Sequence, residues 1–311
     1  MKHPAQPILS IIGAGSIGAS LGKLWSERGV VAIGGVKNRS LESSQVAVEA
    51  IGSGTPLSPD DPLPRSDLIC IATADDAIPS IAAHLSGLTA RLSGTPVIFH
   101  CSGVLSSAAL APLKKNLSTS VASAHPAVSW SQRGMQPLLH QSPLCALEGD
   151  EEAVALLSDA FTRIGFHPFV LSAATKARYH AALAIASNYT VTLASIATEL
   201  LETCNLSRTP SLDLIRGLLG STIENLTRLP PQEALTGPLV RGDLETISLH
   251  LTALCPFPEI LQAYKTLGIA TLRLASERYP ERETLYHDAE RILSDTPTTQ
   301  DETRLSIKIG N

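Results

Sequence analysis

The sequence lacks the features that mark disulfide-bonded, zinc-binding and nucleic-acid-binding proteins. Its five cysteines are odd in number, scattered and without a C-x-x-C pair, which argues against a disulfide framework and a zinc ribbon. Basic residues do not predominate, because 24 Lys and Arg stand against 29 Asp and Glu for a formal net charge of −5. We therefore expect neither nucleic acid nor an acidic lipid surface as a partner.

Long apolar runs are also missing. No stretch of about 20 uninterrupted apolar residues occurs, and the nearest, 181–197, is interrupted by Ser, Asn and Thr. The N-terminus lacks a signal-peptide layout, since the apolar stretch after Pro7 leads straight into a glycine motif. We expect a soluble, cytoplasmic protein with no membrane partner.

What the sequence does contain fits two folded domains. The chain has 311 residues, 44% of them hydrophobic and 17% charged, so it can bury substantial cores. In the first half, short apolar runs typical of strands alternate with segments of helical period. Strands are predicted over 8–12, 30–36, 67–72, 95–100, 119–124, 144–148 and 166–171, and helices over 41–50 and 76–88. This alternation predicts an α/β fold with a mostly parallel sheet and helices on both faces.

The pattern changes near Ser172. From Ala173 to about Leu293 the chain shows long helical periods broken by Pro and Gly, with no alternating strand pattern. We therefore predict two domains, an α/β domain over 1–172 and an all-helical domain over 173–311. The Thr-rich tail after Ser294 is expected to be flexible or loosely docked.

A glycine-rich hexapeptide follows the first predicted strand. Gly13-Ala14-Gly15-Ser16-Ile17-Gly18 has G-x-G-x-x-G spacing and opens a helix, the context that a dinucleotide-binding turn requires. Gly13 allows the tight turn, Gly15 lets the backbone approach a pyrophosphate, and Gly18 lets helix pack on strand. The N–H groups of the helix start, at Ser16 and Ile17, would face the phosphates. The first domain is thus predicted to be Rossmann-type.

The end of the second strand indicates which cofactor binds. NAD sites normally carry an acid there, about 20 residues beyond the glycines, to hold the ribose 2′-hydroxyl. This chain instead has Lys37-Asn38-Arg39-Ser40, and its first acid is Glu42. A cationic, hydroxyl-bearing loop suits a 2′-phosphate, with Arg39 as its planar partner. We expect NADP(H), held by Asn38, Arg39 and Ser40.

Small residues follow the next predicted strand. Ala72, Thr73 and Ala74 lie at its carboxyl end, where ligands bind in open α/β sheets. They are expected to let the cofactor ribose pass. Asp76 is predicted to be the N-cap of the following helix.

Three polar clusters are candidates for the reaction centre. His100, Ser102 and Gly103 follow one strand and His125 follows another, so both groups should meet at the edge that carries the glycine turn. Lys176 and His180 are spaced i, i+4 and share a helix face. The polar residues further along the chain are Asn188, Arg241, Asp243 and His250, of which Asp243 is also a predicted helix N-cap.

These motifs resemble those of a known family. The glycine turn, the His-x-Ser-Gly of 100–103, His125-Pro126, the Lys-x-x-Tyr-His of 176–180, Asn188-Tyr189 and the Thr-Gly-Pro, Arg-Gly-Asp and His of 236–250 carry the resemblance. The family is a little-characterised bacterial group of NADP oxidoreductases with a Rossmann-like N-terminal and a helical C-terminal domain. Its superfamily is similar to the 6-phosphogluconate and β-hydroxyacid dehydrogenases, pyrroline-5-carboxylate reductases and ketopantoate reductases.

The resemblance implies an NADPH-dependent reductase of a small 2-oxo acid or related carbonyl compound, ketopantoate-like in character. Lys176 takes the position of the superfamily's catalytic Lys, whereas His180 stands where Asn is usual, so either Lys176 or His180 protonates the carbonyl oxygen. Asn188 completes the catalytic set. The Ser102-Gly103 pair resembles the loop that binds a substrate carboxylate through backbone N–H groups. His100, His125, Arg241 and His250 are the other expected substrate residues.

Other interpretations stay open. The chain could be a non-catalytic NADP-binding sensor, an imine reductase, or a prephenate-dehydrogenase-like enzyme that decarboxylates oxidatively. No His, Cys or acid spacing supports a metal site. Cys70 and Cys101 are interpreted as buried small residues. Since the helical half has long apolar faces, and superfamily helices of this kind pair, we expect a homodimer with Arg241 and His250 near the partner's site.

Overall fold

The computed structural model describes residues 6–87, 95–117, 119–129 and 143–295 of the chain. These residues form two compact units, Met1–Tyr189 and Thr190–Asn311, which are described separately. The predicted change at 172/173 marks the end of the strands, because the last of them, β8, ends at Val170. The two units divide later, after the helix that carries Lys176.

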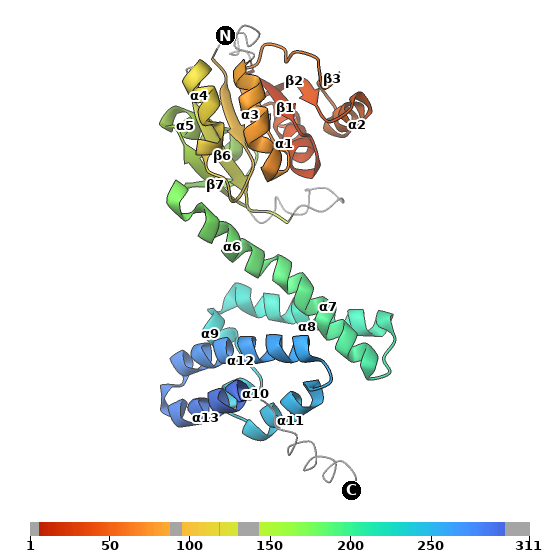
Figure 1. The fold of residues 1–311 in the computed structure, drawn as a ribbon, viewed down its shortest axis with the longest axis vertical. Helices are drawn as coiled ribbons and strands as arrows, with labels where there is room; N and C mark the ends of the chain where they lie inside the picture. The colour runs from red at the N-terminus through yellow and green to blue at the C-terminus, as the bar shows by residue number, and fades with distance from the viewer. Residues whose placement is uncertain (1–5, 88–94, 118, 130–142, 296–311) are drawn as a thin grey trace. The chain divides into compact units, whose positions relative to one another are not determined.

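The first unit is built on one eight-stranded sheet (Figure 1). The strand order is β3-β2-β1-β4-β5-β6-β7-β8, and among the described strands every neighbouring pair is parallel except β6 with β7. The strands are β1 (Ile8–Ile12), β2 (Ala32–Lys37), β3 (Thr55–Leu57), β4 (Leu68–Ile71), β5 (Val97–His100), β6 (Val121–Pro126), β7 (Leu144–Gly149) and β8 (His167–Val170). The predicted Rossmann-type sheet is confirmed, and each predicted strand is present with ends shifted by no more than a few residues.

Helices cover both faces of this sheet. The helices of the unit are α1 (Ser16–Glu27), α2 (Leu41–Ile51), α3 (Ile78–Gly87), α4 (Ala111–Leu117), α5 (Glu151–Arg163) and α6 (Lys176–Ala186). Apolar side chains of α1, α2 and α5 form one buried layer, and those of α3 and α4 form another. Trp25 ties α1 to α5, because its Nε1 donates to the Ala160 carbonyl oxygen at 2.9 Å.

The order of the strands reverses between β1 and β4. The chain runs outward from β1 through β2 to β3, then returns to place β4 on the other side of β1. Ligands bind at such a switch point, beyond the carboxyl ends of the strands. The glycine turn follows β1 and Thr73 follows β4, so both lie at this position.

One cap prediction is wrong and another is confirmed. Asp76 does not cap α3, because Asp75–Ala77 form a 3-10 turn that runs directly into Ile78 without a side-chain cap. Asp243 does cap its helix: the Asp243 Oδ1 accepts from the Thr246 N–H at 3.1 Å and Oδ2 accepts from the Thr246 hydroxyl at 2.8 Å.

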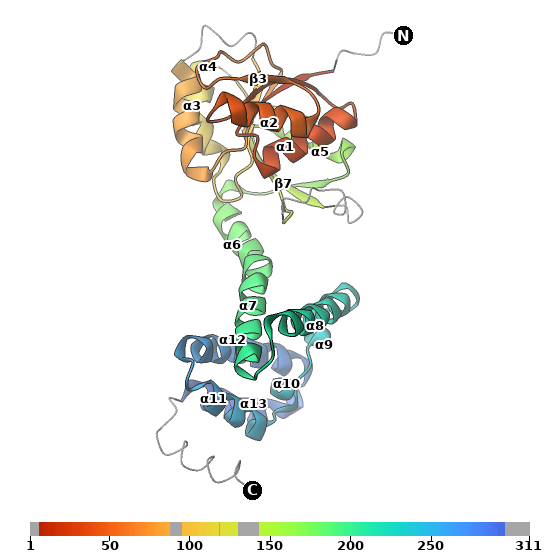
Figure 2. The same ribbon diagram turned by 90° about the vertical axis from the view of Figure 1, so that its right-hand side faces the viewer.

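The second unit is entirely helical among its described residues. Its helices are α7 (Asn188–Thr203, which starts in the first unit), α8 (Arg208–Arg228), α9 (Pro231–Ala234), α10 (Pro238–Arg241), α11 (Leu244–Leu254), α12 (Pro258–Arg278) and α13 (Glu283–Ser294). Helices α11, α12 and α13 (Figure 2) enclose one apolar core. The hydroxyl of its buried Tyr286 donates to the Val240 carbonyl oxygen at 2.8 Å. The all-helical prediction is confirmed, while the tail after residue 295 lies outside the described residues.

Helices α7 and α8 bury very little of their surface. Thr198 is the buried residue of α7, and Ser211 and Ile215 are those of α8. Among the described residues, one helical stretch, Ala173–Thr203, passes the length and composition test for a membrane span, with mean hydropathy 1.3. The cytoplasmic location therefore stays a prediction.

Candidate active site

The turn after β1 has the geometry expected of a nucleotide-binding turn. Gly13 has φ +83°, and a Cβ there would lie 2.8 Å from the Thr73 amide nitrogen, so no other residue fits. A Cβ on Gly18 would meet the Gly13 carbonyl oxygen at 2.9 Å. A Cβ on Gly15, by contrast, would meet no protein atom within 4 Å. Packing within the described chain does not require glycine at 15, whereas an approaching ligand would.

Polar groups without partners among the described residues occur at the start of α1 and on Thr73, the residue that packs against Gly13. Within the described chain, no side chain caps α1, whose first N–H groups, at Ser16, Ile17 and Gly18, point beyond the helix start. The Thr73 hydroxyl oxygen is buried without a hydrogen-bond partner among the described residues. Buried hydroxyls are normally hydrogen-bonded. The free helix start, the open face of Gly15 and the orphaned Thr73 hydroxyl together fit a dinucleotide.

The end of β2 and the loop that follows it contain three residues whose side chains make structural hydrogen bonds and one arginine whose side chain makes none among the described residues. Asn38 Oδ1 accepts from the Ala14 N–H at 2.7 Å, which ties this loop to the glycine turn. Ser40 caps α2 in a capping box with Ser43. The Lys37 ammonium donates to the Pro59 carbonyl oxygen at 3.0 Å and also to that of Asp61. Arg39 is exposed, and its side chain has no hydrogen bond or ion pair among the described residues. Of the predicted 2′-phosphate residues, Arg39 is the one left free.

A buried lysine lies behind the loop that follows β5. Lys176 begins α6 and is 1% exposed; its ammonium donates to the Ser123 hydroxyl at 2.6 Å and to the Ser102 carbonyl oxygen at 3.2 Å. Burial lowers the pKa of Lys176, and the Glu148 carboxylate partly opposes that shift. Lys176 forms no ion pair with any described residue, so its charge acts on the loop.

The same loop is shaped from within by Ser102 and His100. His100 is fully buried; its Nδ1 accepts from the Ser102 N–H at 3.2 Å, and its Nε2 lies 3.0 Å from the Ser106 carbonyl oxygen. The Ser102 hydroxyl oxygen accepts from the N–H groups of Val104 and Leu105. Both nitrogens of His100 are engaged, so the structure gives it a positioning role in place of the predicted substrate contact. The Ser102 N–H is also engaged, which leaves the Gly103 N–H for a ligand.

Two histidines border Gly103. A Cβ at position 103 would lie 2.9 Å from His125 Nε2 and closer still to His180 Cδ2. The centroids of the His125 and His180 rings are 5.8 Å apart, and the ring planes meet at 79°. On its other side, His125 Nδ1 is 3.0 Å from the Tyr179 hydroxyl. Burial, with the nearby Lys176 and His180, lowers the pKa of His125 to about 4, against the weaker effect of Asp75.

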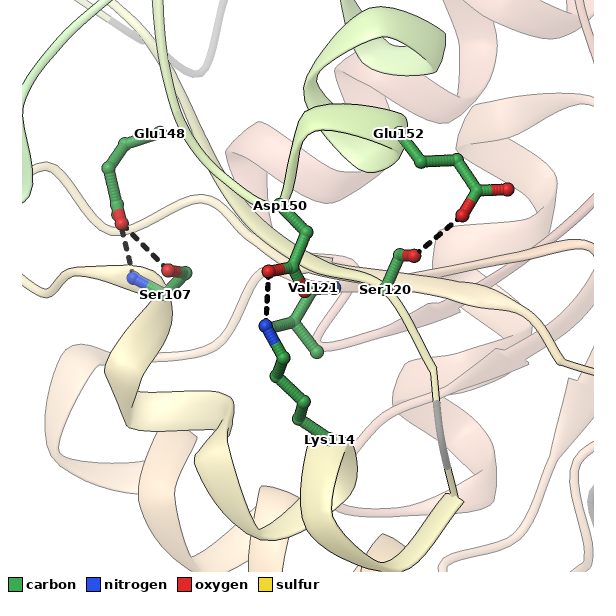
Figure 3. A network of polar contacts seen from close by, with 7 residues as sticks. All are labelled: Ser107, Lys114, Ser120, Val121, Glu148, Asp150 and Glu152. Carbon is green, nitrogen blue, oxygen red and sulfur yellow. Dashed lines mark hydrogen bonds and ion pairs between the residues drawn. The ribbon is translucent and has the colours of Figure 1, made fainter.

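Carboxylates of β7 and the following residues fix the other end of this loop (Figure 3). Glu148 accepts from both the N–H and the hydroxyl of Ser107, each at 2.7 Å. Asp150 accepts from the Val121 N–H at 3.0 Å and pairs with Lys114. The loop between β5 and α4 is therefore held at Ser107 as well as at Ser102.

The remaining predicted residues are Asn188, Arg241 and His250, and the contacts found for Arg241 and His250 join them to residues of the second unit. Asn188 is the first residue of α7. Arg241 and His250 belong to the second unit, where Arg241 pairs with Asp243 at 3.8 Å and His250 Nδ1 is 2.9 Å from the Tyr264 hydroxyl. Their participation in the site stays a prediction.

Sequence reasoning missed three residues. Tyr179 lies within the motif of 176–180 but received no role, Ser123 is hidden in an apolar strand, and Glu148 ends an ordinary strand pattern. The spacing of Tyr179 three residues after Lys176 was the one available signal, because it places both on adjoining parts of a helix surface.

Two family models match the chain. Residues 2–126 match a Rossmann-like domain, and residues 143–271 match a domain of unknown function, DUF2520. The first unit has a Rossmann-like fold. Among curated proteins none matches.

Solved structures extend the likeness over most of the chain. A protein of Bacteroides fragilis, provisionally described as an NADP oxidoreductase, is 20% identical with a TM-score of 0.69, covering 86% of this chain and 98% of its own. Protein TM1727 of Thermotoga maritima is 24% identical, with a TM-score of 0.59 and coverage of 90% and 98%. A Plasmodium falciparum pyrroline carboxylate reductase with NADP bound is 11% identical, with a TM-score of 0.52 and coverage of 94% and 100%. At these identities the likeness concerns the fold.

Proposed function

We propose that the protein is an NAD(P)H-dependent oxidoreductase acting on a small carbonyl compound. The observation that carries this proposal is the turn at the β1/β4 switch point, where the open Gly15, the uncapped start of α1 and the orphaned Thr73 hydroxyl converge. Similar folds occur in proteins named as an NADP oxidoreductase and a pyrroline carboxylate reductase, which supports the same class here. When bound, the reduced nicotinamide supplies the hydride.

The free guanidinium favours NADPH over NADH. The Arg39 side chain, which follows β2, has no hydrogen bond or ion pair among the described residues. The Lys37 ammonium, by contrast, donates to carbonyl oxygens of a neighbouring loop. No acid stands at Lys37-Asn38-Arg39-Ser40 to receive a ribose 2′-hydroxyl. Arg39 would therefore hold the 2′-phosphate.

The substrate is proposed to be anionic, of the 2-oxo acid class that includes ketopantoate. Among the described residues the Gly103 N–H has no hydrogen-bond partner, and the rings of His125 and His180 both pack against this residue. Behind it, the uncompensated Lys176 ammonium is buried, and a buried charge acts strongly on nearby anions. Lys176 would stabilise both a substrate carboxylate and the charge that develops on the carbonyl oxygen.

Titration with NADPH and NADH by calorimetry tests cofactor binding first. Oxidation of NADPH at 340 nm then tests a panel of 2-oxo acids with ketopantoate, together with pyrroline-5-carboxylate. Reduction of NADP⁺ with prephenate runs in the opposite direction. Turnover of a 2-oxo acid supports the proposal, and turnover of the imine or of prephenate alone replaces the substrate class. Tight NADPH binding without turnover of any compound supports the sensor alternative, and no cofactor binding overturns the proposal.

We also propose that the active form is a homodimer. Helices α7 and α8 expose apolar side chains, including Val191 at 70% and Leu218 at 61%. Exposed apolar side chains of this kind suit contact with a second copy of the chain related by two-fold symmetry. A second copy is therefore the occupant that we propose for the exposed faces of α7 and α8.

A further inference from the structure

A hydrogen-bonded tyrosine–histidine pair borders the proposed substrate position. The Tyr179 hydroxyl is 3.0 Å from His125 Nδ1, and the two rings meet edge to face with centroids 5.7 Å apart at 86°. Tyr179 lies near the start of α6, and His125 lies near the end of β6. Both side chains are partly buried, so this contact persists away from bulk water.

The second nitrogen of His125 faces Gly103, in the loop between β5 and α4 where we propose that the substrate binds. Its Nε2 would be 2.9 Å from a Cβ at position 103, and only the missing side chain of Gly103 leaves room for the ring edge. Within the described chain, Nε2 has no hydrogen-bond partner. A group with one nitrogen tied back and the other turned toward a bound molecule is arranged to give or take a proton.

The protonation states of the pair follow from its surroundings. Burial raises the pKa of Tyr179 to about 12, with a smaller contribution from Cys145, so its hydroxyl keeps its proton at neutral pH. His125 is neutral there, because burial, Lys176 and His180 all lower its pKa, while Asp75 only partly opposes them. A neutral imidazole carries one proton. If Nδ1 accepts from Tyr179, that proton sits on Nε2, beside Gly103.

We infer that Tyr179 is a positioning residue that holds His125 in its Nε2–H tautomer, and that the pair delivers the proton to the substrate oxygen. This inference rests on the proposed carbonyl reduction. The new C–H bond on the carbonyl carbon would form with the hydride pair released when a C–H bond of the reduced nicotinamide breaks, and the π electrons of the C=O bond would move to oxygen. The Nε2–H bond of His125 breaks as the new O–H bond forms. Nδ1 takes the Tyr179 hydroxyl proton, and the phenolate regains a proton from water.

The pair predicts a pH dependence that a charged histidine donor cannot give. An imidazolium donor would lose activity as pH rises through about 6.5. Tyr179 and neutral His125 hold their protons well above that value, so turnover in the reductive direction should stay flat between about pH 6 and 9. From the sequence, Lys176 or His180 was expected to donate the proton to the carbonyl oxygen. In this inference His125 donates it, and Lys176 and His180 are charged or polar neighbours of His125.

Nitrogen NMR of ¹⁵N-histidine-labelled protein tests the tautomer without substrate or cofactor. His125→Gln identifies the His125 signals. The wild type should show His125 at pH 7 with a protonated Nε2 and an unprotonated Nδ1, and Tyr179→Phe should convert it to a mixture of tautomers. The second unit offers a matched control: the Tyr264 hydroxyl is 2.9 Å from His250 Nδ1, with rings 5.7 Å apart at 85°. Tyr264→Phe should change only the His250 signals.

Either of two results overturns the inference: a protonated Nδ1 on His125 in the wild type, or an unchanged His125 in Tyr179→Phe.

Kinetics supply a second readout on the 2-oxo acid of the panel with the highest turnover. Tyr179→Phe should lower kcat on the order of 10²-fold, with KM and NADPH affinity changed less than about threefold. A falling wild-type profile near pH 6.5 contradicts the relay. Should NADPH not bind at all, the proposed function fails, while the NMR result still decides the tautomer.

Discussion

The amide nitrogen of Thr73 lies 2.8 Å from the point where any residue other than glycine would carry its Cβ at position 13. The turn after β1 and the end of β4 therefore touch without an intervening side chain. Because strand order reverses between these two strands, the contact stands at the position where open α/β sheets bind ligands. Thr73, whose buried hydroxyl has no partner among the described residues, therefore packs directly against the glycine turn.

Gly15→Ala should separate binding from folding. The new methyl group meets no protein atom within 4 Å, so the melting temperature should stay the same or rise slightly. The methyl would occupy the pyrophosphate position, and NADPH affinity should fall at least about tenfold, or ~1.4 kcal/mol. Calorimetric titration and thermal unfolding measure the two effects. Gly87→Ala is the control, because a Cβ there is equally unobstructed but lies at the end of α3. Unchanged NADPH affinity in Gly15→Ala would place the cofactor elsewhere.

Arg39→Ala should weaken NADPH selectively. Loss of a charge-assisted hydrogen bond costs roughly 1.5–3 kcal/mol, which corresponds to about tenfold or more in affinity. Affinity for NADH should barely move, since NADH has no 2′-phosphate. Arg28→Ala, at the opposite end of α1, should leave both affinities unchanged. Equal weakening of both cofactors by Arg39→Ala would contradict a 2′-phosphate role.

Lys176→Met should lower turnover on a verified substrate by on the order of 10²–10³-fold, with a smaller change in NADPH affinity. The substitution removes the buried charge whose effect is greatest when the carbonyl oxygen becomes negative. Lys115→Met, on the exposed surface of α4, serves as the matched control. Circular dichroism confirms that both variants fold. Wild-type turnover in a folded Lys176→Met protein would remove the lysine from the site.

His125 should make the fold sensitive to acid. Its pKa is about 4 in the folded protein and about 6.5 when unfolded, so between these values the unfolded state binds more protons. The contribution of His125 to the free energy of unfolding is fully present above about pH 6.5. It decreases by about 3 kcal/mol as the pH falls toward 4. His125→Gln should flatten this slope in urea denaturation between pH 7 and 4.5, leaving the smaller share of buried His100, whose pKa burial also lowers. The exposed His84→Gln should keep the wild-type slope, and an unaltered slope in His125→Gln would show that His125 is not the group responsible.

Leu218→Glu should dissociate the proposed homodimer. A carboxylate on the exposed face of α8 would be desolvated at an apolar interface, which is unfavourable. Light scattering at micromolar concentration should give about twice the 32.8 kDa chain mass for the wild type and one chain mass for the variant. Val46→Glu, at an equally exposed apolar position of α2, should stay dimeric. A monomeric wild type would refute the dimer.

The sheet was predictable because its signals are local. Apolar runs bounded by Gly and Pro give the strands, and the glycine spacing gives the turn. The cap at Asp243 was also local, since Thr246 is three residues away. The prediction that Asp76 is a helix N-cap was wrong because Asp75–Ala77 form a 3-10 turn where the helix was expected to start. The sequence pattern of a 3-10 turn is nearly the same as that of a helix start.

The centre of the candidate site depends on contacts that sequence spacing does not encode. Tyr179 and His125 are 54 residues apart, and Lys176 reaches Ser123 across 53. Only the register of the sheet and the entry of α6 bring them together. Similarly, the engagement of the Ser102 N–H by His100 depends on a ring orientation that no motif predicts.

Asn38 links the loop after β2, where we propose that the 2′-phosphate binds, to the glycine turn. Its carbonyl oxygen holds the Ala14 N–H, while its amide donates to the Ser43 carbonyl oxygen at 2.8 Å. A drift toward the acid usual in NAD enzymes would keep the first bond and place a negative carboxylate oxygen against the second. Exchange of coenzyme preference, by evolution or in the laboratory, would therefore require compensating changes at the start of α2 along with the loss of Arg39.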